Sequence, residues 1–384
     1  MLNAKLLLVW SFMGISILAV GQPILSEEVE EQADKLFSEI LEDGPGYMIG
    51  VIKNQNILFQ KGYGMANLEH QIPITAKTVF NVASLSKQFT AACIALLILD
   101  QKLSLEDPIN QHIDNIPKSY ESIKVKHLMY MCSGLQEYYD CERKNGTDWS
   151  SLNFFSLDTA ISATLHYGEL NYKPGSRWSY SNVNFMLLAR MVENLSGKRL
   201  AEFAKERIFD PLGMHNTLIN DNIFQPIFNR ADGYIEPEKS DDVVYFYEKG
   251  YIPESVEPFL QVRRNSPHYA GSGVYSSLED LAKWDANWYT HQLAGPEFYA
   301  LMHKRIIFDH YKTNDAFGLA FGDFNGEEIV WYDGRTLGFR AYMMRFPKHQ
   351  LTLICLSNLE TGPSPRSRTD KLLDILLNSN VFKF

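Results

Sequence analysis

Ser84 and Lys87, in the segment Ser-Leu-Ser-Lys, have the residue types and the spacing for nucleophilic chemistry. Ser84 is the only serine in the chain that is followed by a lysine three positions later. The apolar run 89–99 predicts a helix that opens here, and residues three apart share a helix face. The helix dipole and partial burial both lower a lysine's pKa at that end. A neutral Lys87 would accept the Ser84 proton and make the hydroxyl a nucleophile.

Ser84 also has a structural interpretation, as the N-cap of the same helix. That alternative leaves Lys87 in the first turn, where a cation opposes the helix dipole by about 0.3–1 kcal/mol. Both interpretations of the serine stay open at this point.

A second polar pattern is Tyr180-Ser181-Asn182, which precedes a run of helical periodicity. Only Tyr180, among 20 tyrosines, has an asparagine two positions later. In the functional interpretation its phenol faces Ser84 and Lys87, where an ammonium lowers the phenol pKa and favours a role as base or proton shuttle. Asn182 would then bind Lys87 or the substrate. Alternatively, Asn182 is only a helix cap.

Other catalytic and cofactor templates are absent from the sequence. There is no Gly-x-Ser-x-Gly elbow, no phosphate-binding loop, no dinucleotide fingerprint and no His-Glu-x-x-His zinc spacing. We therefore expect neither a metal nor another cofactor.

The elements that must position these residues form strands at both ends of the chain and helices between them. A helix is predicted from Ser26 to Gly44. Period-two patterns and turn residues predict the strands 47–52, 57–63, 317–321, 329–332, 339–346 and 351–356, and a last helix spans about 370–377. The connections between the strands are short, which favours antiparallel pairing.

This order predicts an α+β fold with one antiparallel sheet built from both chain ends, flanked by helices. The domain 22–384 would comprise a sheet lobe (27–84 and 292–384) and an inserted, mostly helical lobe (85–291). The chain has 384 residues, 45% of them hydrophobic, which is enough for a packed core.

Charge and the first residues indicate the cellular context. With Lys+Arg 36 against Asp+Glu 46, the net charge is -10, which argues against a nucleic-acid partner. Lys5 and the apolar run 6–20 are typical of a cleavable signal peptide, residues 1–21. We expect a secreted or periplasmic protein with no stable membrane span after cleavage. An uncleaved anchor is the alternative, and the oligomeric state is open.

Four cysteines are present in the sequence. Cys93 and Cys355 lie in apolar runs and are expected to be buried thiols. Cys132 and Cys141 flank a polar loop, and an oxidising compartment would allow them to pair. Their pairing stays open.

The order of these motifs resembles that of serine β-lactamases and penicillin-binding proteins. Their three motifs correspond to Ser84-x-x-Lys87, Tyr180-x-Asn182 and a strand ending at Gly334. The segments around and between the motifs resemble those of the class C branch, which includes related esterases and D-aminopeptidases. The matching segments are 80–87, 128–135 (with Met131 and Cys132 where His and Thr are usual), 210–214 and 273–282.

The resemblance implies roles for the residues at these positions. Ser84 would be the acylated nucleophile and Lys87 and Tyr180 the proton-transfer pair, with Asn182 as a partner of the substrate or of Lys87. The backbone N–H groups of Ser84 and Arg335 would form an oxyanion hole. The implied partner is a small-molecule or peptide substrate.

The third motif, Tyr332-Asp333-Gly334-Arg335, departs from the family pattern. Class C enzymes have lysine, and related peptidases or esterases often histidine, where Tyr332 stands. Tyrosine supplies no cation for a substrate carboxylate, although Arg335 would partly replace it. We therefore expect an exported hydrolase of an ester, amide or D-amino-acid peptide, and weak β-lactamase activity. The alternative is a non-catalytic, penicillin-binding-like receptor.

Overall fold

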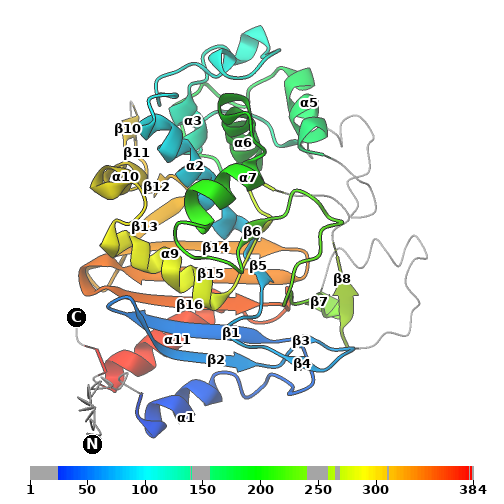
Figure 1. Ribbon diagram of the computed structural model, residues 1–384, viewed down its shortest axis with the longest axis vertical. Coiled ribbons are helices and arrows are strands. Elements are labelled where there is room, and N and C mark those ends of the chain that lie inside the picture. The colour runs from blue at the N-terminus through cyan, green and yellow to red at the C-terminus, as the bar shows by residue number, and fades with distance from the viewer. Residues whose placement is uncertain are drawn as a thin grey trace, which may run out of the picture.

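The computed structural model describes residues 25–138, 140, 156–239, 258–263, 269–308, 311–379 and 381–382. It has the predicted α+β fold, with one large antiparallel sheet covered by helices (Figure 1). The expected signal segment 1–21 lies outside the described residues. None of the described helices combines the length and the apolar character that crossing a bilayer requires.

The large sheet has seven strands in the order β12-β13-β14-β15-β16-β1-β2. Their bounds are β1 Tyr47–Lys53, β2 Asn56–Tyr63, β12 Asp315–Ala316, β13 Leu319–Phe324, β14 Glu327–Thr336, β15 Phe339–Phe346 and β16 Leu351–Ser357. Every pairing is antiparallel, including β1 with β16, where Tyr47 lies opposite Ser357. The sheet is therefore built from both chain ends, as the sequence predicted.

The first hairpin shows why these residues form strands. Asn54 and Gln55 connect β1 to β2 with φ angles of 49° and 68°, the left-handed conformation of a tight hairpin turn. Along β1, Met48 belongs to the core under the central helices, whereas Tyr47 and Ile49 belong to a second core on the opposite face. Alternation along the strand thus buries both faces of the sheet.

One face of the sheet carries the helices from the middle of the chain. These are α2 Lys87–Leu99, α3 Val125–Met129, α5 Leu157–Tyr167, α6 Asn182–Ser196, α7 Leu200–Ala204, α9 Leu278–Thr290 and α10 Gly295–Met302. α2 packs against α6, α7 and α10, and α9 packs on β1, β2 and β16 (Figure 1). The division into lobes at 85 and 291 stays a prediction. Elements on either side of the second boundary cross it, because α9, assigned to the helical lobe, packs on the sheet, and α10, assigned to the sheet lobe, packs on α2.

The opposite face of the sheet is covered by α1 (Glu27–Lys35) and α11 (Pro365–Asn378), which pack on each other. Phe37 stacks on Tyr63 of β2 with ring centroids 4.1 Å apart. This second core fixes the far side of the sheet.

Short elements join the layers. The small strands are β3 Met65–Asn67, β4 Ile72–Pro73, β5 Phe80–Asn81, β6 Leu218–Ile219, β7 Gly233–Ile235, β8 Leu260–Val262, β9 Val274–Ser276, β10 Ile307–Phe308 and β11 Tyr311–Lys312. The short helical turns are η1 Ala83–Ser86, η2 Ile109–Gln111, η3 Lys118–Tyr120, η4 Lys205–Phe209, η5 Pro237–Lys239 and η6 Pro347–His349. The sheet β5-β9-β6 leads the chain directly into η1.

Two predicted helix boundaries were wrong, by nine and by about five residues. The first helix ends at Lys35 instead of Gly44, because the chain continues in i→i+3 turns such as Ile40 N–H to the Phe37 carbonyl. The last helix begins five residues earlier than predicted, at Pro365, a residue that suits a first helical position. Periodicity locates an element better than its ends.

The three cysteines that the structure describes are all buried. Cys93 and Cys355 are buried thiols, as predicted. Cys132 is buried, and Cys141 lies outside the described residues, so their pairing stays a prediction.

Candidate active site

Ser84 lies in the turn η1 that connects β5 to α2. Ala83 has a φ of 49°, an unfavourable conformation for alanine, and its N–H donates to Asn81 Oδ1 at 2.9 Å. α2 begins only at Lys87, and its N-cap position is Ser86. The interpretation of Ser84 as the N-cap of this helix is therefore wrong. The turn instead presents the Ser84 hydroxyl to neighbouring elements.

Lys87 is fully buried at the first position of α2. Its Nζ lies 3.2 Å from Ser84 Oγ, 3.0 Å from Asn182 Oδ1 and 2.6 Å from the Gly271 carbonyl oxygen. Burial lowers the pKa of Lys87 to about 7, and the negative charge of Glu137 opposes this change only partly. The amine therefore exchanges its proton near neutral pH.

Tyr180 completes the contacts of the Ser84 hydroxyl. The two side-chain oxygens are 2.6 Å apart, and Lys87 Nζ lies 4.7 Å from the centre of the phenol ring. Although Tyr180 is 39% exposed, crowding around its phenol oxygen desolvates that group and raises the pKa of Tyr180 to about 12; the Ser84 hydrogen bond lowers it, and the charges of Glu137 and Asp333 raise it. The expected lowering of the Tyr180 pKa was wrong, because desolvation, the strongest influence on the phenol, raises it. Tyr180 remains a phenol at pH 7.

The segment around 131–137 holds the second motif in place. Ser179 N–H donates to the Met131 carbonyl at 2.8 Å, just before Tyr180. Ser133 Oγ donates to Asn184 Oδ1 at 2.6 Å within α6. Gly134 has a φ of 83°, and a Cβ there would lie 2.1 Å from the Tyr172 carbonyl oxygen. Backbone contacts thus explain the glycine of this segment.

Glu137, in the same segment, is the site residue that the sequence reasoning missed. Its Oε1 accepts a 2.5 Å hydrogen bond from the Asn182 N–H, at the first residue of α6. Burial raises the pKa of Glu137, and the bonds at the α6 N-terminus and the charge of Lys87 lower it. An acidic residue two positions after Ser-Gly-Leu was the available signal, but its partner lies 45 residues away.

The third motif lies on β14, directly beside η1. β13 pairs with β14 only as far as Trp331, so the following residues of β14 have no partner strand on that side among the described residues. A Cβ on Gly334 would lie 2.7 Å from the Ser84 backbone nitrogen, so only glycine allows this approach. Gly334 therefore brings the backbone of β14 next to the nucleophile turn.

Tyr332 and Arg335 point in different directions from this strand. Tyr332 is 8% exposed and joins the core below the helices. Its pKa is raised by burial and by the charges of Tyr180, Asp315 and Asp333. Tyr332 thus adds no cation to the site.

The expectation that Arg335 partly replaces the missing cation stays a prediction, but the structure gives its guanidinium another partner. Side chains alternate along a strand, so Arg335 lies on the face opposite to that of Gly334. Its Nε donates to Glu360 Oε1 at 3.0 Å, and Gly338 N–H donates to Glu360 Oε2 at 2.9 Å. The guanidinium therefore fixes the β14–β15 turn, and only the Arg335 backbone adjoins the site.

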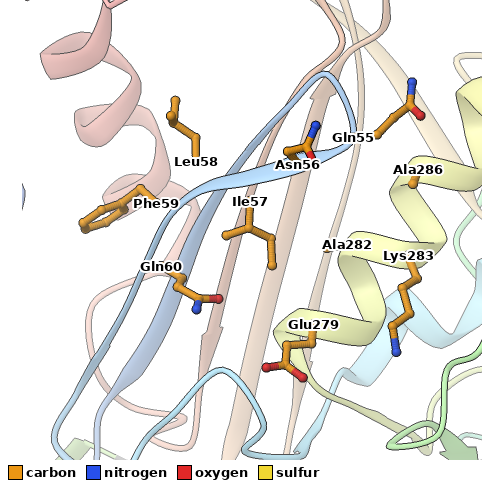
Figure 2. Close-up of a pocket in the computed structure, with 10 residues that line it drawn as sticks. All are labelled: Gln55, Asn56, Ile57, Leu58, Phe59, Gln60, Glu279, Ala282, Lys283 and Ala286. Atoms are coloured by element: carbon orange, nitrogen blue, oxygen red, sulfur yellow. The ribbon is translucent and has the colours of Figure 1, made fainter. Parts of the chain in front are cut away.

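A groove of about 480 Å³ lies between β2 and α9 (Figure 2). It is lined by Gln55, Asn56, Ile57, Leu58, Phe59, Gln60, Glu279, Ala282, Lys283 and Ala286. None of these is a predicted site residue. Across the described ranges of the chain, no group of three or more His, Cys, Asp or Glu side chains is arranged to hold a metal ion.

Comparison with known proteins gives consistent matches. A family model described as Beta-lactamase matches residues 33–377. Penicillin-binding protein 4* of Bacillus subtilis (strain 168) is 28% identical over 321 residues, which are 79% of this chain and 66% of that protein. The D-aminopeptidase of Brucella anthropi is 27% identical over 332 residues, 84% of this chain and 57% of that protein. This chain thus spans less than two thirds of both relatives.

A solved structure shares the fold. The D-amino acid amidase of Ochrobactrum anthropi SV3, in complex with D-phenylalanine, superposes with a TM-score of 0.75 at 19% identity. The match covers 92% of this chain and 99% of that one. The likeness extends over both the large sheet and the helices that carry the candidate site.

Proposed function

This chain belongs to the beta-lactamase family, and we propose that it is a serine hydrolase that forms an acyl-enzyme on Ser84. The observation that carries the proposal is the pair of contacts at that hydroxyl. Lys87 Nζ lies 3.2 Å and Tyr180 OH 2.6 Å from Ser84 Oγ. An activated serine needs such a base within hydrogen-bond reach.

Lys87 is the base in this proposal. A neutral amine has two N–H bonds and one lone pair. The oxygens of Asn182 and Gly271 accept hydrogen bonds only, so they take the two N–H groups. The lone pair is then left for the Ser84 proton. A pKa of about 7 populates the neutral form at physiological pH.

The reaction follows from these positions. Ser84 Oγ attacks the substrate carbonyl carbon while Lys87 takes the hydroxyl proton. The oxyanion is stabilised by the backbone N–H groups of Ser84 and Arg335, which Gly334 allows to approach each other. Tyr180, a phenol at pH 7, donates a proton as the bond to the leaving group breaks, and it regains one from Lys87. Water then hydrolyses the acyl-enzyme by the reverse proton transfers.

The substrate class follows from charge. Tyr332 supplies no cation, and Arg335 is engaged with Glu360 on the other face of β14. A substrate carboxylate therefore finds no partner at the third motif. Esters, amides and D-amino-acid peptides remain suitable, and the names of the relatives D-aminopeptidase and D-amino acid amidase support this class. Strong β-lactamase activity is not expected.

Export is part of the proposal. It rests on the signal-like residues 1–21, which precede the family match at 33–377. The protein would act outside the cytoplasm, as a domain spanning 22–384, on substrates found there.

The competing function is a receptor that keeps the fold and binds a ligand without turnover. Tyr332, where the family has a cation, is the observation that favours it. The contacts of Ser84, Lys87 and Tyr180 support the enzyme instead, since a receptor needs no base beside its serine.

The test compares purified wild type with Ser84→Ala. Both are incubated with p-nitrophenyl esters, a D-amino-acid p-nitroanilide, a D-Ala-D-Ala peptide and a chromogenic cephalosporin, and intact mass is measured for an acyl adduct. We expect wild type to turn over an ester or a D-amino-acid substrate, and Ser84→Ala to lose both turnover and adduct. A wild type that never gains acyl mass favours the receptor.

A further inference from the structure

Glu137 has contacts that the proposed reaction does not yet use. Its Oε1 accepts from the Asn182 N–H at 2.5 Å, and the Ser181 hydroxyl and the Val183 N–H also favour its charged form. All three groups belong to the N-terminus of α6. The carboxylate is thus held by the N-terminus of α6, and none of the described cations forms an ion pair with it.

The position of Glu137 matters because α6 has no cap of its own. The first turn of α6 contains no acidic residue, and its N-cap side chain makes no capping bond. A carboxylate at a helix N-terminus satisfies orphan N–H groups and interacts favourably with the dipole. Glu137 therefore supplies this cap from a separate segment of the chain.

The first residue of α6, Asn182, connects Glu137 to Lys87 through two hydrogen bonds. Glu137 holds the backbone of Asn182, and the side chain of Asn182 accepts from Lys87 Nζ at 3.0 Å. Lys87 in turn lies 3.2 Å from Ser84 Oγ. Moving the first turn of α6 would therefore move an acceptor of the lysine.

The charge of Glu137 also acts on Lys87. Around Lys87, the described titratable groups are Tyr180 and Glu137. Asp333 acts on Tyr180, whereas Asp315 acts on Tyr332. Of these, Glu137 acts on Lys87 itself and favours its protonated form. The pKa near 7 is thus a balance between burial and one carboxylate.

Resting on the proposed function, we propose that Glu137 is a positioning residue of this site. Its carboxylate anchors the first turn of α6, and with it the Asn182 oxygen that holds the Lys87 amine, and its negative charge favours the protonated amine.

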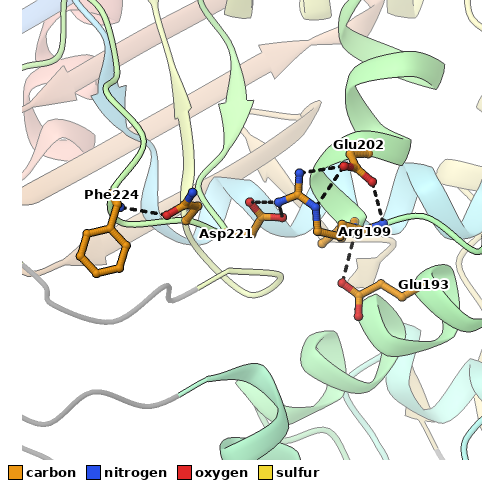
Figure 3. Close-up of polar contacts among 7 residues, drawn as sticks. Glu193, Arg199, Glu202, Asp221 and Phe224 are labelled. Carbon is orange, nitrogen blue, oxygen red and sulfur yellow. Dashed lines mark hydrogen bonds and ion pairs between the residues drawn. The ribbon is translucent and has the colours of Figure 1, made fainter.

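The test separates the charge from the hydrogen bond. Glu137→Gln keeps an oxygen acceptor and the side-chain shape but removes the charge, and Glu137→Ala removes both. Glu193→Gln is the matched control. Glu193, on the same helix, accepts from the Leu200 N–H at the start of α7, and burial also raises its pKa (Figure 3).

The first readout is the protonation of Lys87 itself. The protein is labelled with ¹³C at lysine Cε, and the Lys87 resonance is identified by its absence from Lys87→Met. Titration then gives the midpoint in each variant. We expect Glu137→Gln to move the midpoint to lower pH and Glu193→Gln to leave it at the wild-type value. An unchanged or higher midpoint in Glu137→Gln overturns the inference, whether or not the protein is active.

The second readout is acylation by a fluorophosphonate probe between pH 5 and 9. In the wild type, the rate should rise with pH as Lys87 loses its proton, and in Glu137→Gln the rise should occur at lower pH. Glu137→Ala should also lose at least about tenfold in the plateau rate, because Asn182 is displaced. A wild type that is never labelled contradicts the proposed function, while the titration of Lys87 still decides the role of Glu137.

Discussion

Two buried cations in this molecule have different surroundings. Arg345 is 3% exposed, and its Nε donates to Asp285 Oδ1 at 2.7 Å, an oxygen that also accepts from Thr352 Oγ1 at 2.7 Å. Lys87 is fully buried but contacts a hydroxyl, an amide oxygen and a backbone carbonyl, and no carboxylate of the described residues lies within salt-bridge distance. The arginine side chain thus lies in an ion pair, the lysine in a set of neutral acceptors.

The difference in surroundings explains why one cation stabilises the fold and the other is suited to proton transfer. Arginine stays protonated in proteins, and a direct carboxylate partner compensates part of its desolvation. Lysine releases its proton when burial is not compensated, and neutral acceptors hold the amine in position in either protonation state. Arg345 accordingly joins α9 to β15 and β16, whereas Lys87 is suited to proton transfer.

The largest expected effect is that of removing the uncompensated cation. Lys87→Met should lower the acylation rate by about 10²–10⁴-fold, because the base is lost. The free energy of unfolding at pH 7 should nevertheless increase by ~1–3 kcal/mol, because the cost of desolvating a buried amine is removed. The Gly271 carbonyl, which loses its hydrogen-bond partner, offsets part of this gain. Probe labelling and urea denaturation measure the two effects.

The pH dependence of that stability gain follows from the lysine pKa. Lys87 titrates at about 7 in the folded state and at its ordinary 10.5 when unfolded, so the unfolded chain binds more protons between these values. The wild type therefore gains stability as pH rises through this window. The advantage of Lys87→Met should be largest at pH 7 and below, and should shrink towards pH 10. A constant advantage would argue against a lowered lysine pKa.

Breaking the paired cation should have the opposite result. Arg345→Met leaves Asp285 buried without its cation and should destabilise the fold by about 3–5 kcal/mol. The double variant Arg345→Met/Asp285→Asn should recover part of this loss, because no charge is left unpaired. Denaturation measures both variants. Acylation by the folded protein should stay near the wild-type rate, and a loss as large as that of Lys87→Met would contradict the structural role.

Asp315 extends the comparison to an anion. Burial raises its pKa to about 6, and within the part of the chain that the structure describes no cation contacts its carboxylate. The folded state therefore binds more protons than the unfolded state between pH 3.8 and 6, and the cost of the charge is complete above pH 6. Asp315→Asn should be more stable than wild type by ~1–3 kcal/mol at pH 7 and about equally stable at pH 4. Thermal unfolding at both pH values checks this.

The smallest expected effect sharpens the comparison at the third motif. In Tyr332→Lys, the carboxylates of Asp315 and Asp333 lie near the new amine, so it should stay protonated, unlike Lys87. Acylation by a carboxylate-bearing β-lactam, relative to an uncharged ester, should increase about two- to fivefold. Tyr332→Gln is the uncharged control. An equal gain in both variants would show that the loss of the aromatic ring, and not the new charge, causes the increase.

The sequence predicted those parts of the site that local geometry determines. Ser84 and Lys87, three residues apart, meet because the helical turn η1 places such residues on the same side, and this needs no knowledge of the fold. The sheet from both ends followed from the short apolar runs, bounded by turn residues, that became β1, β15 and β16, whose residues are buried on both faces.

The remaining parts depend on tertiary contacts. Gly271 contributes a backbone carbonyl, which any residue type would supply, so no sequence signal identifies it. The direction of Arg335 depends on the register of β14, and one residue changes the face. The Tyr180 pKa depends on how far the phenol is buried. Glu137 was missed because its capping bond joins two segments that are far apart in sequence.

The pairing of β1 with β16 has a consequence for how the protein is made. Tyr47 and Ser357 are neighbours in the sheet although about three hundred residues separate them in the chain. A ribosome must therefore finish almost the entire polypeptide before its first long strand gains a neighbour on that side, and contacts of such long range form slowly. Until then the apolar faces of the N-terminal hairpin stay uncovered, and such surfaces favour aggregation while synthesis continues.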